Sequence, residues 1–187
     1  MKKLMFMLAA VAMAACAQAA SVYWTCTYVA NGSGYVDNGL AFFVNAATLS
    51  QSDMLALEGK GATAISSALS GMYSYAGDSD GKYTVGKADA VANATLGLTD
   101  ATASQAYLVI FDTATITDSS NFYVTEVKSF NALSGTETVS LKWGDQEDRS
   151  TTAGAWHAAS GSAVPEPTSG LLMLVGLAGL ALRRRRA

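Results

Sequence analysis

Ala106-Tyr107-Leu108-Val109-Ile110-Phe111 is the stretch that decides the fold class of this 187-residue chain. All six residues are apolar, and the run is bounded by polar or small residues on both sides. A short, continuous apolar run of this kind is typical of a strand with both faces buried. The sequence therefore predicts a central strand at 106–111, around which the rest of the body is organised.

Shorter runs on both sides of this segment predict further strands. Most combine apolar or aromatic residues with Thr or Ser, whereas 40–44 is apolar throughout, and the runs are separated by Ser, Thr, Asn, Asp and Gly. In the last run, Val139, Leu141 and Trp143 share one face. The expected strands are 22–29, 40–44, 72–75, 82–85, 121–127 and 136–143.

The apolar period changes between residues 50 and 71, which predicts a short helical pair. Ser50 followed by Asp53 fits a capping box, and Gly71 can close the second helix. The expected fold is mainly β, an antiparallel sheet or sandwich covered by this helical pair. A signal helix at the N-terminus and a hydrophobic helix at the C-terminus complete the prediction.

The C-terminal tail has three distinct parts. Val164-Pro165-Glu166-Pro167 is held extended, since proline fixes its own φ and disfavours the helical region for the residue before it. An apolar run follows at 170–182, and Arg183, Arg184, Arg185 and Arg186 form a stop that is hard to pull across a membrane. As a helix the apolar run would be roughly 20 Å long. The hydrocarbon core of a bilayer is about 30 Å thick, and an ordinary spanning helix has roughly 20 residues.

In this order, the three parts resemble the PEP-CTERM sorting signal of Gram-negative bacteria, including the Gly176 and Gly179 of its apolar helix. The resemblance implies that an exosortase, a membrane-embedded cysteine protease, recognises and processes the chain at Pro165-Glu166-Pro167. It also implies a transient stay in the inner membrane, then the cell surface or an extracellular matrix rich in exopolysaccharide. The alternative is a plain membrane anchor, but the short span favours a segment that is removed.

The N-terminus predicts export by the Sec machinery. Lys2 and Lys3 precede an apolar run at 4–15, and Ala17 and Ala19 supply a small-x-small cleavage site, so we expect cleavage after Ala19. The rival interpretation is a lipoprotein box with Cys16 as the lipidated residue. Such a box normally has leucine at the position of Met13, and a second anchor would be redundant.

The chain thus divides into a signal peptide at 1–19, a β-rich exported domain at 20–149, a flexible linker at 150–163 and the sorting signal at 164–187. All 15 acidic residues lie between residues 20 and 169, where only 6 of the 12 basic residues remain. That part carries a formal charge of −9, which excludes nucleic acid as a partner because phosphates are not neutralised.

Catalytic chemistry has few candidates. Cys26 is expected to be a buried hydrophobe on one strand face with Val22 and Trp24. Once Cys16 is removed it has no partner for an intramolecular disulfide, and an intermolecular disulfide in the oxidising periplasm is the open alternative. His157 is the single histidine and falls in the expected linker, which argues against a catalytic triad. The best carboxylate pair is Asp112 and Glu126. We expect no enzymatic activity and no cofactor.

Metal binding has only weak candidates. Asp78 and Asp80 resemble the start of a calcium loop, without the glutamate that an EF-hand needs at its twelfth position, and an acidic turn is favoured. Asp145, Glu147 and Asp148 form a second acidic patch that is interpreted as a solvated loop.

Two functions remain open. The first is a non-catalytic cell-surface or matrix protein. The alternative is an extracellular carbohydrate-binding module, in which aromatic side chains on one solvent-facing sheet stack on sugar rings. Its candidate residues are Tyr23, Tyr73, Tyr75 and Tyr83.

Overall fold

The computed structural model describes residues 20–27, 29–31, 34–143 and 156–161. The expected signal helix and C-terminal hydrophobic helix lie outside these residues, as do the candidate acidic patch at 145–148 and the sorting motif. Within the described part of the chain, no helix is both long and apolar enough to span a bilayer.

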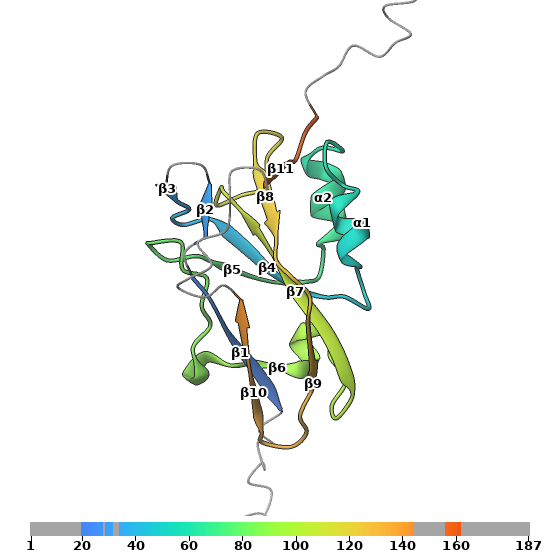
Figure 1. Cartoon of the computed structure of the whole chain (residues 1–187). Coiled ribbons are helices and arrows are strands. Elements are labelled where there is room, and N and C mark those ends of the chain that lie inside the picture. Colours follow the sequence, from blue (N-terminus) through green and yellow to red (C-terminus); the bar gives the residue numbers. More distant parts are fainter. Residues whose placement is uncertain (1–19, 28, 32–33, 144–155, 162–187) are drawn as a thin grey trace, which may run out of the picture.

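The larger sheet has six strands and is built around the predicted central strand. Its order is β11-β8-β7-β4-β5, with β9 pairing the first half of β7, and every pairing is antiparallel. The nine-residue β7 is long enough to pair with β4 on one side and with β9 and then β8 on the other (Figure 1). The strands are β4 (Leu40–Asn45), β5 (Tyr73–Ala76), β7 (Ala103–Phe111), β8 (Asn121–Val124), β9 (Lys128–Asn131) and β11 (Trp156–Ala158).

The smaller sheet has three strands, β1 (Ser21–Cys26), β6 (Val91–Ala92) and β10 (Thr138–Trp143). The two longer strands, β1 and β10, lie side by side in parallel, with Ser21 opposite Thr138 and Cys26 opposite Trp143 (Figure 1). This pair is an exception to the predicted antiparallel arrangement. Parallel strands need a long connection between them, and β1 and β10 are separated by most of the body, so this requirement is met. A two-stranded hairpin, β2 (Ala30–Asn31) and β3 (Gly34–Tyr35), stands apart.

The core has two layers, one on each face of the larger sheet. In β7, Ala106, Leu108 and Ile110 belong to the sandwich core against the smaller sheet, while Tyr107 and Val109 alternate with them into the helix-side core. β4 divides in the same way. Two-sided burial therefore explains why the predicted central strand is apolar at every position. The prediction of a mainly β fold with antiparallel sheets and few helices is confirmed.

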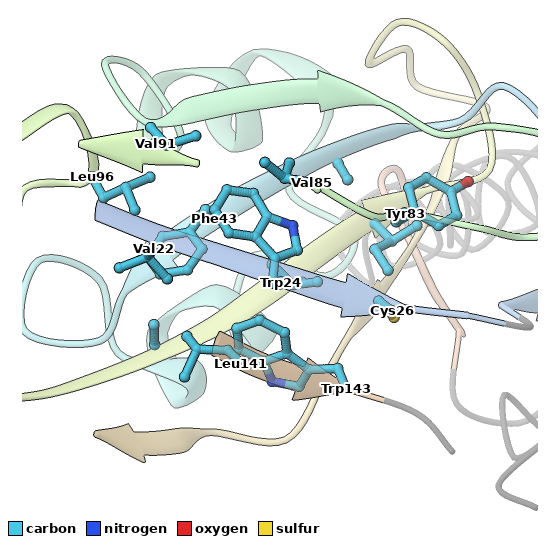
Figure 2. Packing of buried hydrophobic residues seen from close by; sticks show 14 of the residues in the cluster. Val22, Trp24, Cys26, Phe43, Tyr83, Val85, Val91, Leu96, Leu141 and Trp143 are labelled. Atoms are coloured by element: carbon cyan, nitrogen blue, oxygen red, sulfur yellow. The ribbon is translucent and has the colours of Figure 1, made fainter. Parts of the chain in front are cut away.

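Trp24 lies at the centre of the sandwich core. Figure 2 shows its indole between Phe43 of β4 and the side chains that neighbouring segments contribute, among them Val85, Leu141 and Trp143. The Trp24 and Phe43 ring centroids are 4.9 Å apart. Val22, Trp24 and Cys26 are all buried on one face of β1, as the alternation in the sequence predicted.

The helical pair covers the opposite face of the larger sheet. α1 (Gln51–Leu55) begins after Ser50, whose Oγ accepts a hydrogen bond from the Asp53 N–H at 3.1 Å, so the predicted cap is confirmed. α2 (Ala62–Ala68) follows after Gly61. Two short 3₁₀ turns, η1 (Lys87–Asp89) and η2 (Asn93–Leu96), flank β6. The helices fill the helix-side core with Met54, Ile65 and Leu69.

Several predicted elements differ from the observed ones. The expected strand at 22–29 ends at Cys26. Residues 82–85 do not form a regular strand, although Val85 forms an isolated antiparallel β-bridge with Trp24. The expected strand at 121–127 ends at Val124, and β9 is a separate strand. Residues 156–161 are not a flexible linker: β11 pairs with β8, and Ala159 is fully buried. The two aromatic residues in a small, polar segment were the signal for this contact.

Candidate functional site

The tyrosines expected to form a sugar-binding row are mostly part of the core. Tyr83 is fully buried, and its hydroxyl donates to the Val36 carbonyl oxygen at 3.1 Å. The Tyr75 hydroxyl accepts a hydrogen bond from Trp24 Nε1–H at 2.8 Å. Burial raises the pKa of Tyr75 well above its usual value of 10. Both hydroxyls are therefore structural.

The other two tyrosines do not restore a common binding face. Tyr73 stacks on Tyr75 with centroids 6.1 Å apart and packs against the sandwich core. Tyr23 lies on the outer face of β1, opposite to the face that carries Trp24. The expected coplanar row is therefore wrong, because Tyr73 and Tyr75 on β5 and the buried Tyr83 face the core, whereas Tyr23 lies on the outer face of the other sheet.

Cys26 is buried in the sandwich core, as predicted. Desolvation raises the pKa of its thiol from 9.0 to about 12. A reactive cysteine needs a lowered pKa and an exposed thiolate. The environment of Cys26 instead raises the thiol pKa and shields the sulfur from solvent. Cys26 is therefore an unreactive residue of the core.

We expect Cys26 in the native protein to resist alkylation by iodoacetamide at pH 8. A pKa raised from 9.0 to about 12 lowers the thiolate fraction about a thousand-fold. Mass spectrometry of the processed protein before and after unfolding in urea measures the difference. Rapid labelling of the native protein, at the rate seen in urea, would contradict this assignment.

The candidate carboxylate pair is not brought together. Asp112 accepts hydrogen bonds from Asn31 Nδ2 and from the backbone and side-chain amides of Asn121, at 2.7 to 3.0 Å. Glu126 lies beyond the other end of β8 and forms an ion pair with Lys128. Glu126 lies five residues after Asn121, the backbone partner of Asp112, and five residues of extended chain correspond to roughly 16 Å. This separation exceeds the roughly 5 to 10 Å between two carboxylates that glycoside hydrolysis requires.

The weak calcium candidates form a tight turn. Asp80 has a positive φ of 62° and pairs with Lys82, with 3.3 Å between Oδ2 and Nζ, at an exposed position. The Asp78 N–H donates to the Lys82 carbonyl oxygen at 2.8 Å. Across the described ranges, no three His, Cys, Asp or Glu side chains are grouped so that they could hold a metal.

His157 has a structural position that its sequence context did not suggest. Its Nδ1 lies 3.0 Å from Glu58 Oε2, and its ring packs on Phe122 with centroids 5.4 Å apart. The N–H groups of Gly59 and Gly61 donate to the carbonyl oxygens of residues 158 and 159. The side-chain contact of His157 with Glu58 and these two backbone hydrogen bonds hold the 156–161 segment against the connection between α1 and α2.

A groove of about 690 Å³ lies where β4 ends and where β7 and β9 run side by side. Its lining is uncharged and consists of amides, hydroxyls, small side chains and one aromatic ring. The residues come from three separate segments: Asn45, Ala46 and Ala47; Thr99, Thr102, Ala103, Ser104 and Gln105; Ser129, Phe130 and Asn131.

Internal hydrogen bonds order part of this groove. Asn45 Nδ2 donates to the Gly97 carbonyl oxygen at 2.7 Å, and its Oδ1 accepts from the Ala47 N–H at 3.0 Å. Gln105 Nε2 donates to Ser129 Oγ at 3.2 Å. The groove was not predicted because its residues are ordinary polar loop and strand-end positions, and only the pairing of β7 with β4 and β9 brings them together.

The tail at residues 163–186 is a sorting signal separate from the β-rich body. The family model for the PEP-CTERM protein-sorting motif matches residues 163–186, in agreement with the resemblance found in the tail. The motif implies export to the cell envelope or surface and recognition by an exosortase. No curated protein and no solved structure matches the chain significantly.

Proposed function

We propose that this chain is a non-catalytic cell-surface or exopolysaccharide-matrix protein. Its signal peptide is cut after Ala19, and an exosortase then processes the tail at Pro165-Glu166-Pro167. The observation that carries the proposal is the sorting motif at residues 163–186. The membrane holds the chain only until that second cut, after which the body reaches the surface or the matrix.

The chemistry of the body supports a non-catalytic role. The thiol of Cys26 is buried with a raised pKa, Asp112 is occupied by amide donors, and His157 pairs with Glu58. These three side chains are thus engaged in packing or in a structural contact, and the fourth candidate, Glu126, forms an exposed ion pair with Lys128. We therefore propose that the body acts as a non-catalytic domain displayed at the cell surface or in the matrix.

The proposal is tested by cell fractionation with intact-mass measurement, in strains with and without the exosortase gene. We expect a shortened chain at the surface or in the medium when the exosortase is present. Without it, the chain should keep its C-terminal tail and stay in the inner membrane. A processed chain that remains in the inner membrane of the exosortase-positive strain would contradict the surface role.

A second candidate function is binding of an uncharged polysaccharide, and the groove lined by Gln105 and Asn131 favours it. Amides and hydroxyls are suited to hydrogen bonds with sugar hydroxyls, and Phe130 adds an apolar surface. The surrounding body is acidic, with 15 acidic residues against 6 basic ones between 20 and 169. That charge opposes an anionic polysaccharide, so the proposed ligand is neutral.

We expect the variant Asn131→Ala to weaken binding to a neutral exopolysaccharide about five-fold, the effect of losing roughly 1 kcal/mol from one hydrogen bond. The exposed Ser74→Ala on β5 is the control and should bind like the parent. Calorimetric titration of the processed protein with a neutral and an anionic polysaccharide measures both. Absence of heat with the neutral one would exclude this second function.

A further inference from the structure

The first described residue of the body is already part of its core. Ala20 is fully buried and immediately precedes β1. Its carbonyl oxygen accepts a hydrogen bond from the Asn93 N–H at 2.8 Å, which continues the antiparallel pairing of Ser21 with Ala92. Ala20 and Asn93 are therefore opposite each other at the end of the smaller sheet. This is the position where the proposed signal-peptide cut creates a new N-terminus.

Asn93 has an unmatched acceptor at this position. Its side chain is 2% exposed, and Nδ2 donates both to Asp100 Oδ1 at 2.7 Å and to the Leu133 carbonyl oxygen at 2.9 Å. Asn93 Oδ1, in contrast, has no hydrogen-bond partner, and within the described ranges it is the one buried side-chain oxygen or nitrogen in this condition. Folded proteins pair nearly all such atoms, so a missing donor is indicated.

The Asp100 carboxylate and the carbonyl oxygens of Leu133 and Glu137 lie near the same end of β1. Asp100 is tied to the Asn93 amide, and the Ser21 N–H donates to the Glu137 carbonyl oxygen at 3.1 Å, which brings the start of β10 to the other side. A cation with several N–H donors suits this environment, because hydrogen bonds between charged donors and carboxylate or amide oxygens are stronger than neutral ones. Hydrolysis after Ala19 supplies such a cation.

We propose that the α-ammonium group of Ala20, released by signal-peptide cleavage, binds Asn93 Oδ1 and the Asp100 carboxylate and so completes the fold. The inference rests on the proposed cut after Ala19. In that step water adds across the Ala19–Ala20 peptide bond, Ala19 keeps the new carboxylate, and Ala20 carries the protonated amine. The body therefore reaches its full stability only after the signal peptide has been removed.

The test is a double-mutant cycle on the processed protein, whose N-terminus is first identified by mass. One change inserts a glycine between Ala19 and Ala20, so that cleavage after Ala19 displaces the ammonium group by one residue. The other is Asp100→Asn, which removes the charge but keeps an acceptor for Asn93. Asp89→Asn, an exposed change of the same charge on η1, is the matched control. Thermal unfolding is followed by circular dichroism.

We expect the glycine insertion to lower Tm by about 4 °C, the shift for losing one hydrogen bond to a charged group in a domain of this size. Asp100→Asn should lower Tm by about 2 °C in the parent and have no further effect in the inserted chain, while Asp89→Asn should have none in either. If the inserted chain does not fold, the parent is acetylated at its α-amine in urea and refolded, and the same loss is expected.

Two results would overturn the inference in distinguishable ways. A mature chain that begins at a residue other than Ala20 would remove the proposed cut and, with it, the ammonium group from this position. A chain that begins at Ala20, but whose Tm is unchanged by insertion or acetylation, or whose changes add independently, would leave the cut intact and reject the role of Asn93 and Asp100.

Discussion

Replacing Trp24 with alanine is expected to lower the free energy of unfolding by about 4 kcal/mol, as for other large aromatic side chains removed from a core. Trp24 is fully buried at the centre of the sandwich core. Its ring contacts those of Phe43, Tyr73 and Tyr75, with centroids 4.9 to 5.8 Å apart. The deletion also leaves the Tyr75 hydroxyl without the donor at Trp24 Nε1. Both the cavity and the lost hydrogen bond act in the same direction.

Urea unfolding of the processed protein measures this loss, and two milder variants separate its parts. Tyr75→Phe removes the acceptor of the Trp24 N–H and should cost about 1 kcal/mol. Trp24→Phe keeps an aromatic ring in the cavity and should fall between the two. A domain of this size is stabilised by roughly 5 to 15 kcal/mol in total, so an unchanged midpoint in Trp24→Ala would contradict the central role of this residue.

Changing Pro165, Glu166 and Pro167 together to alanine is expected to abolish C-terminal processing. Proline restricts its own φ and disfavours the helical region for the residue before it, whereas alanine has the highest helix propensity, so the change alters the backbone conformations open to the motif. The change also removes the Glu166 carboxylate from the recognised motif. Intact mass of the membrane fraction should therefore show a chain that retains its C-terminus, in a strain with active exosortase.

The control for this variant lies just upstream of the matched residues 163–186. Ser162→Ala should be processed like the parent, because it leaves the whole motif unchanged. If the triple-alanine chain were also shortened and released, recognition would depend on the apolar run or on the four arginines. The sorting role of Pro165-Glu166-Pro167 would then be rejected.

Where local pattern and tertiary environment agree, the sequence was sufficient. The continuous apolar run at 106–111 predicted a central strand, and the residues of β7 are indeed buried alternately on its two faces. The Ser50 cap was predictable for the same reason: a side chain bonds to a backbone N–H only three residues away. The sorting tail, likewise, is a contiguous motif.

Long-range pairing could not be predicted in this way. The segment at 156–161 has the composition of a linker, yet β8 and the α1–α2 connection supply partners for its backbone. Tyr75 and Tyr83 alternate with polar residues as half-exposed residues do, but their hydroxyls bond to Trp24 and Val36 in the interior. In both cases the deciding neighbours are dozens of residues away.

By itself, the sequence determined six of the longer strands, the helical pair and the sorting signal, because each depends on residues that are near one another in the chain. The tertiary structure alone decided the parallel pairing of β1 with β10, the neutral groove and the burial of Ala20 beside Asn93. These features depend on which backbone groups, far apart in the sequence, form hydrogen bonds. They also depend on which side chains this pairing buries away from water. Periodicity reports which face of a strand is apolar, but not which segment covers it.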